Sequence, residues 1–274
     1  METTTLQGLS LFFDAEEREA AELIGQACVR AVPLIHQLWG LETPEDLQVY
    51  VLTAFLRSVF ISAPWSWRIL LGITLPLWYR RQRKMWQYAG GWEQRFGRRQ
   101  TVGVKPPRLM QEADGSIGAR IFVSKRDIQE KVEFTVCHEL SHAFAAHLKL
   151  PAWLKEGLAM VTVDRYAGRP TVLVETLQAL ERFSPQASAR SYRRISMDDP
   201  DGAVYLYARG YWITRYLWET QPEMLKSLLV KRMPHEPLEN RIAASLGMNR
   251  EEFWSKIDQL VVLWFKQQGP DDDR

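Results

Sequence analysis

The sequence is poor in cysteine, because only Cys28 and Cys137 occur among its 274 residues. Two cysteines are too few for a disulfide framework, so a reducing compartment is expected. The first fourteen residues also lack the basic segment, apolar core and small-residue cleavage site of a secretory signal. We therefore expect a cytoplasmic protein.

A long apolar run is missing as well. The longest one covers residues 69–79, eleven residues between Arg68 and Arg80, whereas a membrane-spanning helix needs about 20. The sequence shows no internal repeat either. An ordinary transmembrane helix is therefore not expected.

Acidic residues are almost absent from one stretch, although the chain as a whole is nearly balanced. With 46% hydrophobic and 25% charged residues and a formal net charge of +2, the composition is that of a globular protein. Between Arg57 and Arg108, however, eleven Lys or Arg accompany a single acid, Glu93, so this stretch carries +10 and the remainder −8. The same stretch holds five of the eleven tryptophans.

This basic, tryptophan-rich block can be interpreted in more than one way. The simplest interpretation is a solvated surface whose tryptophans pack in the core. Peripheral contact with the cytoplasmic face of a membrane through residues 65–84 is the alternative, because tryptophans flank the apolar run and four basic residues follow it. Those residues are Trp65, Trp67 and Trp78, then Arg80, Arg81, Arg83 and Lys84. Arginine beside tryptophan also suits nucleic acid, but no recognition motif accompanies it, so no nucleic-acid partner is expected.

The N-terminal part is expected to combine one helix with short strands. Apolar residues at helical spacing predict an amphipathic helix over residues 14–40, closed by Gly40. A period-two pattern predicts a strand over residues 47–51. Prolines and paired glycines interrupt residues 57–108, which are expected to form an irregular insert. Residues 117–123 are expected to form a further strand.

From Ser124 onward the pattern becomes helical. Residues 124–127 resemble a capping box before a helical run to about Lys149, which Pro151 stops. Further helices are expected over residues 152–166, 171–183, 203–219, 222–232, 236–246 and 250–267, the last capped by Asn249. The order predicts an α+β fold, with a small N-terminal sheet followed by a mainly helical part. We expect a single domain over residues 1–268 and a frayed tail over 269–274.

The helical run contains the segment HELSH at residues 138–142. Residues four apart lie on one face of a helix, so His138 and His142 can both offer an imidazole to one zinc ion. Glu139 lies about 100° around the helix from His138. There it can face a water molecule beside the metal without binding the metal, which is the position of a general base.

A third ligand is expected from Glu156, fourteen positions after His142 in the segment WLKEGLA. Because the helical run stops at Pro151 before the next helix begins, a reversal of direction can bring this carboxylate to the imidazoles. Two histidines and one glutamate leave the fourth zinc position open, as in catalytic zinc sites.

HELSH followed by WLKEGLA resembles the gluzincin metallopeptidases, the peptidase MA-like family, over about residues 117–219. The resemblance implies a zincin-like fold whose helix carries the HExxH motif, zinc held by His138, His142 and Glu156, and Glu139 as the base that activates water. Tyr207-Ala208-Arg209-Gly210 is similar to the family segment whose tyrosine hydrogen-bonds the oxyanion. Tyr207 is thus the expected oxyanion donor, with Tyr211 as second choice.

The implied activity is zinc-dependent hydrolysis of a peptide or protein substrate. The resemblance also implies that residues 117–123 form the edge strand on which an extended peptide lies. Aminopeptidase activity is not expected, because the sequence has no G-x-M-E-N segment. The alternative is a catalytically inactive, zinc-binding interaction module.

Other residues near the motif have simpler interpretations. His36, His147 and His235 are expected to face solvent, and Cys137 is expected to pack against other helices. Asp164 can be interpreted as a carboxylate that orients a ligand imidazole or as a solvated helix charge.

Overall fold

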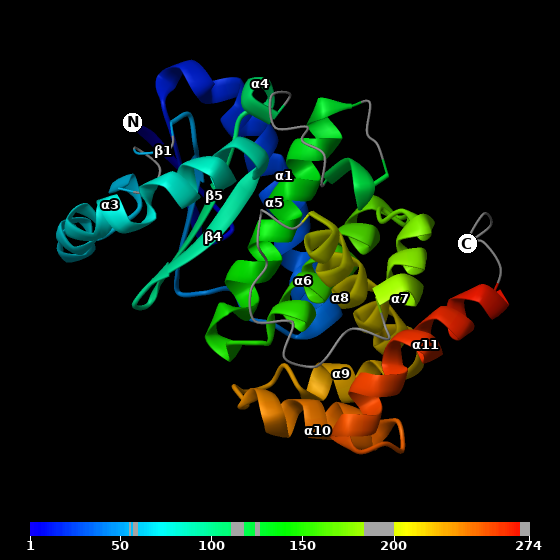
Figure 1. The fold of residues 1–274 in the computed structure, drawn as a ribbon. Coiled ribbons are helices and arrows are strands. Elements are labelled where there is room, and N and C mark those ends of the chain that lie inside the picture. The colour runs from blue at the N-terminus through cyan, green and yellow to red at the C-terminus, as the bar shows by residue number, and fades with distance from the viewer. Residues whose placement is uncertain (55, 57–59, 111–117, 124–126, 184–199, 269–274) are drawn as a thin grey trace. The chain divides into compact units, whose positions relative to one another are not determined.

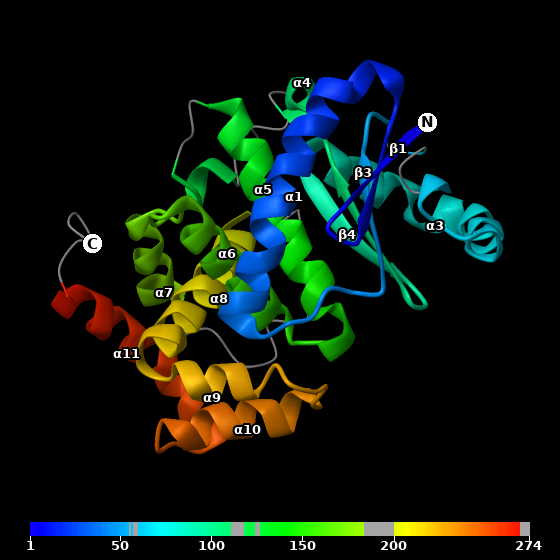
Figure 2. The ribbon, with the colours of Figure 1, turned by 180° about the vertical axis from the view of Figure 1, so that it is seen from behind.

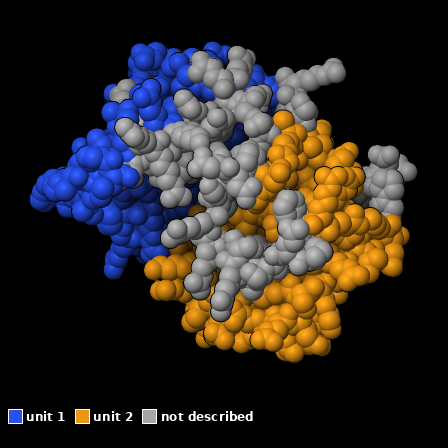
Figure 3. All heavy atoms as spheres, viewed as in Figure 1, with its two compact units in different colours: residues 1–38, 42–115, 124–144 blue, residues 39–41, 116–123, 145–274 orange. Residues whose placement is uncertain are grey.

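The computed structural model describes residues 1–54, 56, 60–110, 118–123, 127–183 and 200–268 (Figure 1). Within these residues the fold is α+β, with a five-stranded mixed sheet in the N-terminal part and a mainly helical remainder. The expected α+β class, with a small N-terminal sheet and a mainly helical remainder, is thereby confirmed. The chain packs as two compact units, which Figure 3 colours separately. Unit 1 comprises residues 1–38, 42–115 and 124–144, and unit 2 comprises residues 39–41, 116–123 and 145–274.

The sheet belongs to unit 1. Its strands are β1 (Glu2–Leu6), β2 (Leu9–Phe13), β3 (Asp46–Val51), β4 (Gly91–Phe96) and β5 (Arg99–Val104). They are ordered β1-β2-β3-β5-β4, with β2, β3 and β5 parallel and both outer strands antiparallel to their neighbours. Strand β4 is therefore an edge strand.

Local sequence explains the first strands. The predicted strand over 47–51 is confirmed as β3. The hairpin of β1 and β2 was not predicted, although its signals are present. Gln7 and Gly8 both have positive φ, 47° and 83°, as the tightest hairpin turns require. After the turn, Leu9, Leu11 and Phe13 alternate into the core.

Two long helices of unit 1 lie side by side in both ribbon views (Figures 1 and 2). They are α1 (Arg18–Trp39) and α5 (Ile128–Ala145), and Arg30 of α1 donates to Glu133 of α5 at 2.8 Å. Helix α1 matches the predicted helix over residues 14–40, and Gly40 follows it with φ 67°. At the start of α5, the Asp127 carboxylate accepts a hydrogen bond from the Gln129 amide. The rest of the predicted capping box, residues 124–126, lies outside the described residues.

The prediction of an irregular insert over residues 57–108 is wrong. This segment forms the 24-residue helix α3 (Trp65–Tyr88), strands β4 and β5, and the short helix α4 (Pro107–Met110). Pro76 lies inside α3 rather than ending it. Strand β5 lies between β3 and β4, and its Gly103 is required because a Cβ atom there would overlap the Leu52 side chain. Gly103 thus marks close packing and Pro76 lies within a helix, so neither residue marks a loop.

The predicted strand over residues 117–123 is also wrong for the described part, residues 118–123. Residues Gly118–Arg120 form a 3₁₀ turn, η2, and Phe122 makes only an isolated bridge with Val172. The segment contributes two backbone hydrogen bonds to residues 171–173, which is too few for a strand. Residue 117 lies outside the described residues.

Unit 2 is helical in its described residues. Its helices are α6 (Ala152–Ala167), α7 (Leu177–Phe183), α8 (Pro200–Thr220), α9 (Pro222–Ser227), α10 (His235–Ser245) and α11 (Arg250–Gln268), with the short turns η3 (Ala146–Leu148) and η4 (Val174–Thr176). The sequence predicted these helices, although α7 and α9 are shorter than expected. The predicted cap of α11 is confirmed, because Asn249 and Glu252 exchange backbone-to-side-chain hydrogen bonds of 3.1 and 2.9 Å. The predicted single domain over 1–268 is not tested, and its tail, 269–274, lies outside the described residues.

Helices α6 and α8 lie side by side (Figures 1 and 2) and approach closely at two glycines. A Cβ atom at Gly157 would overlap the carbonyl oxygen of Gly210 and the Oγ1 of Thr214. A Cβ atom at Gly210 would lie 2.5 Å from the carbonyl oxygen of Trp153. The two backbones are therefore in direct contact, and neither glycine can be replaced without moving a helix.

We predict that Gly157→Ala destabilises the protein by about 1–3 kcal/mol, because the new methyl group must displace the α8 backbone. The matched control is Gly72→Ala in α3, where a Cβ atom meets nothing within 4 Å. There, alanine is expected to stabilise the helix by up to about 1 kcal/mol. Urea unfolding of both variants measures the difference, and equal effects would contradict the packing assignment.

Candidate metal centre

Helix α5 presents the two histidines of the HExxH motif from adjacent turns. The ring centroids of His138 and His142 are 4.5 Å apart, with the ring planes at 82°. His142 is buried and His138 is half-buried. Neighbouring Cys137, Leu140 and Phe144 are fully buried, so packing of these side chains fixes the rotation of the helix. The predicted packing role of Cys137 agrees with its burial.

Helix α6 presents Glu156 in its second turn. Lys149 adopts the left-handed conformation, with φ 52°, and Pro151 stands at the N-cap of α6. These two residues supply the predicted reversal of the chain between η3 and α6. Trp153 and Leu154 anchor the first turn in the core, and Glu156 stays half-buried.

The structure brings the three predicted ligands together. One donor atom from each of His138, His142 and Glu156 lies within 4.8 Å of the others. Donors bound to one zinc at about 2.0–2.2 Å in a tetrahedron lie roughly 3.4 Å apart, so small side-chain adjustments would suffice. Two imidazole nitrogens and one carboxylate oxygen are a donor set that zinc accepts, with one position left open. The residues present therefore fit the metal that the sequence implies.

Glu139 is buried against the edge strand of the sheet. A Cβ atom at Gly91, the first residue of β4, would lie 2.9 Å from the Glu139 Cγ and 2.9 Å from Thr135 Cγ2. The glycine therefore lets β4 approach α5 at the level of the predicted base. Sequence reasoning placed Gly91 in a loop and missed this contact.

The two candidate tyrosines on α8 differ in environment. The Tyr211 hydroxyl donates to Asp164 at 2.6 Å and accepts from Arg215 at 3.1 Å. Tyr211 is fully buried, and burial raises its pKa well above the usual tyrosine range. Tyr207, one turn earlier, is half-buried. The Tyr211 hydroxyl thus takes part in buried structural hydrogen bonds. Tyr207 remains the candidate oxyanion donor.

Neither interpretation of Asp164 is correct. Within the described residues its carboxylate accepts hydrogen bonds from the Thr171 amide, the Thr171 hydroxyl and the Tyr211 hydroxyl, at 2.6–2.8 Å. These bonds join the end of α6 to α8 and to the segment that follows α6, rather than to an imidazole. Burial raises the pKa of Asp164, while the hydrogen bonds from Tyr211 and Thr171 oppose the rise.

The Arg209 of the Tyr-Ala-Arg-Gly segment has a structural role that its motif did not indicate. Its buried guanidinium donates to Asp258 of α11 at 2.5 Å and lies 4.7 Å above the Trp254 ring. The Tyr205 hydroxyl donates to the same carboxylate at 2.7 Å. This segment therefore holds α11 against α8.

The remaining histidines lie on the surface, as predicted. His36, His147 and His235 are exposed, and the His235 ring contacts the Lys149 carbonyl at 2.9 Å.

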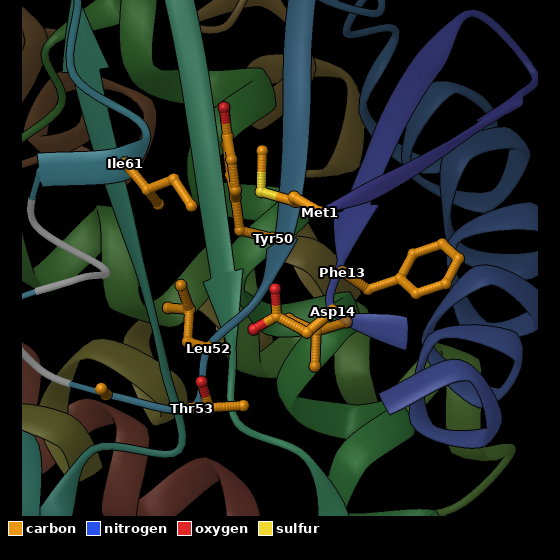
Figure 4. Close-up of a pocket in the computed structure, with 9 residues that line it drawn as sticks. Met1, Phe13, Asp14, Tyr50, Leu52, Thr53 and Ile61 are labelled. Carbon is orange, nitrogen blue, oxygen red and sulfur yellow. The ribbon is translucent and has the colours of Figure 1, made fainter. Parts of the chain in front are cut away.

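A small pocket elsewhere in unit 1, shown in Figure 4, contains no candidate ligand among its lining residues. The residues around it include Met1, Phe13, Asp14, Tyr50, Leu52, Thr53 and Ile61.

Comparison of the chain with protein-family models, with curated proteins and with solved structures finds no match.

We predict that the protein binds one zinc ion per chain and that His138→Ala, His142→Ala and Glu156→Ala each abolish stoichiometric binding. Free zinc at about 100 times its Kd should raise the free energy of unfolding by about 2.7 kcal/mol in the wild type and by much less in these variants. His147→Ala, an exposed histidine of the following turn, is the control and should bind zinc normally. Elemental analysis after dialysis decides the stoichiometry, and full zinc content in a ligand variant would refute the assignment.

We also predict a pH-dependent contribution of Asp164 to stability. Because folding raises its pKa, the contribution is fully present below the ordinary carboxyl pKa, about 4, and is lost as the pH rises through the raised value. Asp164→Asn does not titrate, so wild type should lose stability relative to this variant between pH 4 and pH 7. Urea unfolding over that range measures the difference, and a constant difference would contradict the shift.

Proposed function

We propose that this chain is a zinc-dependent metallopeptidase of gluzincin type, with a zincin-like fold, that hydrolyses peptide bonds. The observation that carries the proposal is the convergence of the His138, His142 and Glu156 donor atoms, with Glu139 next to the first ligand on the same helix. Two separate sequence segments thus supply three metal ligands and a neighbouring general base. A structural zinc site would be closed by a fourth protein ligand, whereas the three ligands found among the described residues leave room for water.

The reaction follows from the roles of these residues. Zinc, when bound, would lower the pKa of a water molecule to about 7 and polarise the substrate carbonyl. Glu139 accepts the proton of the attacking water and passes it to the amine that leaves. Its side chain is buried against β4, which suits a general base. His138 and His142 hold the metal from the same helix, so the distance between base and metal is fixed by helix geometry.

Tyr207 supports the same reaction as the donor to the oxyanion. It lies on α8 three residues before Gly210, where α8 touches the backbone of α6. Glu156 immediately precedes Gly157 on α6, so a single helix contact fixes the relative position of the third ligand and the tyrosine. Such a preorganised hydroxyl lowers the barrier by stabilising charge that develops only in the transition state.

The substrate strand is β4 rather than residues 117–123. β4 is the outer strand of the sheet, and its first residue, Gly91, adjoins Glu139. An extended peptide that adds to this edge would carry its backbone towards the base. We therefore propose that a substrate peptide adds to β4.

We predict that Glu139→Gln lowers the rate of peptide cleavage by about 10²–10⁴ and leaves zinc content and stability unchanged, because only the proton acceptor is removed. Glu130→Gln, two turns earlier on α5, is the matched control and should retain activity. Cleavage of a peptide library by zinc-loaded protein, read by mass spectrometry, measures both.

Two results would count against the peptidase assignment. Equal cleavage by wild type and Glu139→Gln would show that another group or a contaminant acts. Stoichiometric zinc with no cleavage of any peptide or protein by the wild type would favour the alternative, an inactive zinc-binding interaction module.

We further predict that Tyr207→Phe lowers kcat by about 10²-fold with little change in KM, because the hydroxyl acts mainly in the transition state. Tyr211→Phe should instead reduce stability by about 1–3 kcal/mol, since it removes a buried donor to Asp164. Steady-state kinetics and urea unfolding of both variants separate the two roles. A lower kcat only in Tyr211→Phe would reverse the assignment.

A further inference from the structure

Helix α3 has an unusual distribution of apolar side chains, because its large hydrophobic residues face solvent. Both ribbon views show this helix extending away from α1 and α5 of its own unit (Figures 1 and 2). The exposed fractions are 76% for Trp65, 55% for Ile69, 50% for Leu70, 74% for Ile73 and 87% for Leu77. At 100° per residue these five positions fall within an arc of about 140°, here called the apolar arc. An isolated exposed leucine needs no explanation, but a continuous arc does.

Contacts on the opposite side of the helix determine that this arc faces outward. The Trp67 ring lies 5.7 Å from the Phe96 ring, and the Trp86 ring lies 5.0 Å from the Trp92 ring. Phe96 and Trp92 belong to β4. The Lys105 ammonium donates to the Trp86 carbonyl and lies 4.6 Å from the centre of its ring. Aromatic packing at both ends thus anchors α3 to the sheet and leaves the apolar arc uncovered.

The charge of α3 favours an anionic occupant for this face. The helix contains five basic residues and no Asp or Glu. Positions 80, 83 and 84 fall within the same arc further along the helix, and position 81 lies about 20° beyond it. Arg83 is exposed, whereas the side chains of Arg80, Arg81 and Lys84 lie outside the described residues. The outward side of α3 is therefore apolar in its first half and basic by sequence in its second half.

A second copy of the chain does not suit this surface. Pairing two such helices would bring basic residues of both copies into one interface, and neither helix has an acid to neutralise them. An anionic bilayer surface suits both halves, because acyl chains accept the apolar side chains and headgroups accept the basic ones. No helix among the described residues is long and apolar enough to span a bilayer, so contact through α3 would be peripheral.

We infer that the outward side of α3, residues 65–84, docks the protein on an anionic lipid membrane surface. The apolar arc enters the region between headgroups and acyl chains, and the basic second half binds the headgroups. This inference is independent of the metallopeptidase proposal, because α3 contributes no candidate ligand. Strand β4 nevertheless links the two sites, because it anchors α3 and adjoins Glu139. A docked enzyme would therefore act close to the membrane surface.

The test is sedimentation of the full chain with vesicles of phosphatidylcholine alone or with added phosphatidylglycerol, at low and high salt. The wild type is expected to bind the anionic vesicles, less at high salt, and to bind neutral vesicles weakly. The double variant Ile73→Ser with Leu77→Ser should lower binding at least about tenfold, because both side chains are exposed and serve only the lipid contact. Changing Arg80, Arg81, Arg83 and Lys84 to Ser should remove the preference for anionic vesicles.

The matched control is Val230→Ser with Leu263→Ser, two exposed apolar residues of unit 2. This control should bind vesicles as the wild type does, and circular dichroism should show all variants equally folded. Absence of vesicle binding by the wild type, or unchanged binding by the Ile73→Ser, Leu77→Ser variant, would overturn the inference. So would a dimer of the wild type that the same double substitution dissociates, because the face would then bind a second copy.

Discussion

Two glycines let the elements that carry Glu139 and Glu156 pack closely against their neighbours. Gly91 lets the first residue of β4 contact Glu139, and Gly157 lets the turn of α6 that carries Glu156 contact the backbone of α8. At neither position does a Cβ atom fit without displacement of a neighbour. Because protein interiors are close-packed, such contacts leave the neighbouring elements little freedom to move. Close packing therefore positions the segments that carry the proposed base and the proposed third ligand.

The charge asymmetry of the chain has a structural basis. The basic block at residues 57–108 is not an addition to a finished fold, because β4 and β5 complete the sheet and α3 packs on β4. Three tryptophans of this block show two different environments. Trp86 and Trp92 pack against each other, while Trp65 is exposed beside the apolar residues of α3. One segment thus supplies the strand proposed to hold substrate and the helix inferred to contact lipid.

The sequence predicted the helices outside residues 57–108 and the convergence of His138, His142 and Glu156, but it missed helix α3 and most of the sheet, for identifiable reasons. Helix α5 and the pair His138 and His142 follow from a periodicity that is local to the chain. Glu156 could be predicted because only a proline-containing reversal separates it from that helix. Strand β5 could not, because Gly103 and its polar neighbours mask the alternation, and its place in the sheet depends on distant partners. The structural roles of Asp164 and Arg209 likewise depend on contacts with residues far along the chain.

X-ray absorption spectroscopy at the zinc edge of the loaded wild-type protein tests the proposed metal centre most directly. The proposed ligands predict a single four-coordinate zinc with nitrogen and oxygen neighbours at about 2.0–2.2 Å and the outer-shell signal of two imidazoles. Sulfur neighbours at about 2.3 Å, the signal of fewer than two imidazoles, or the absence of bound zinc would contradict it.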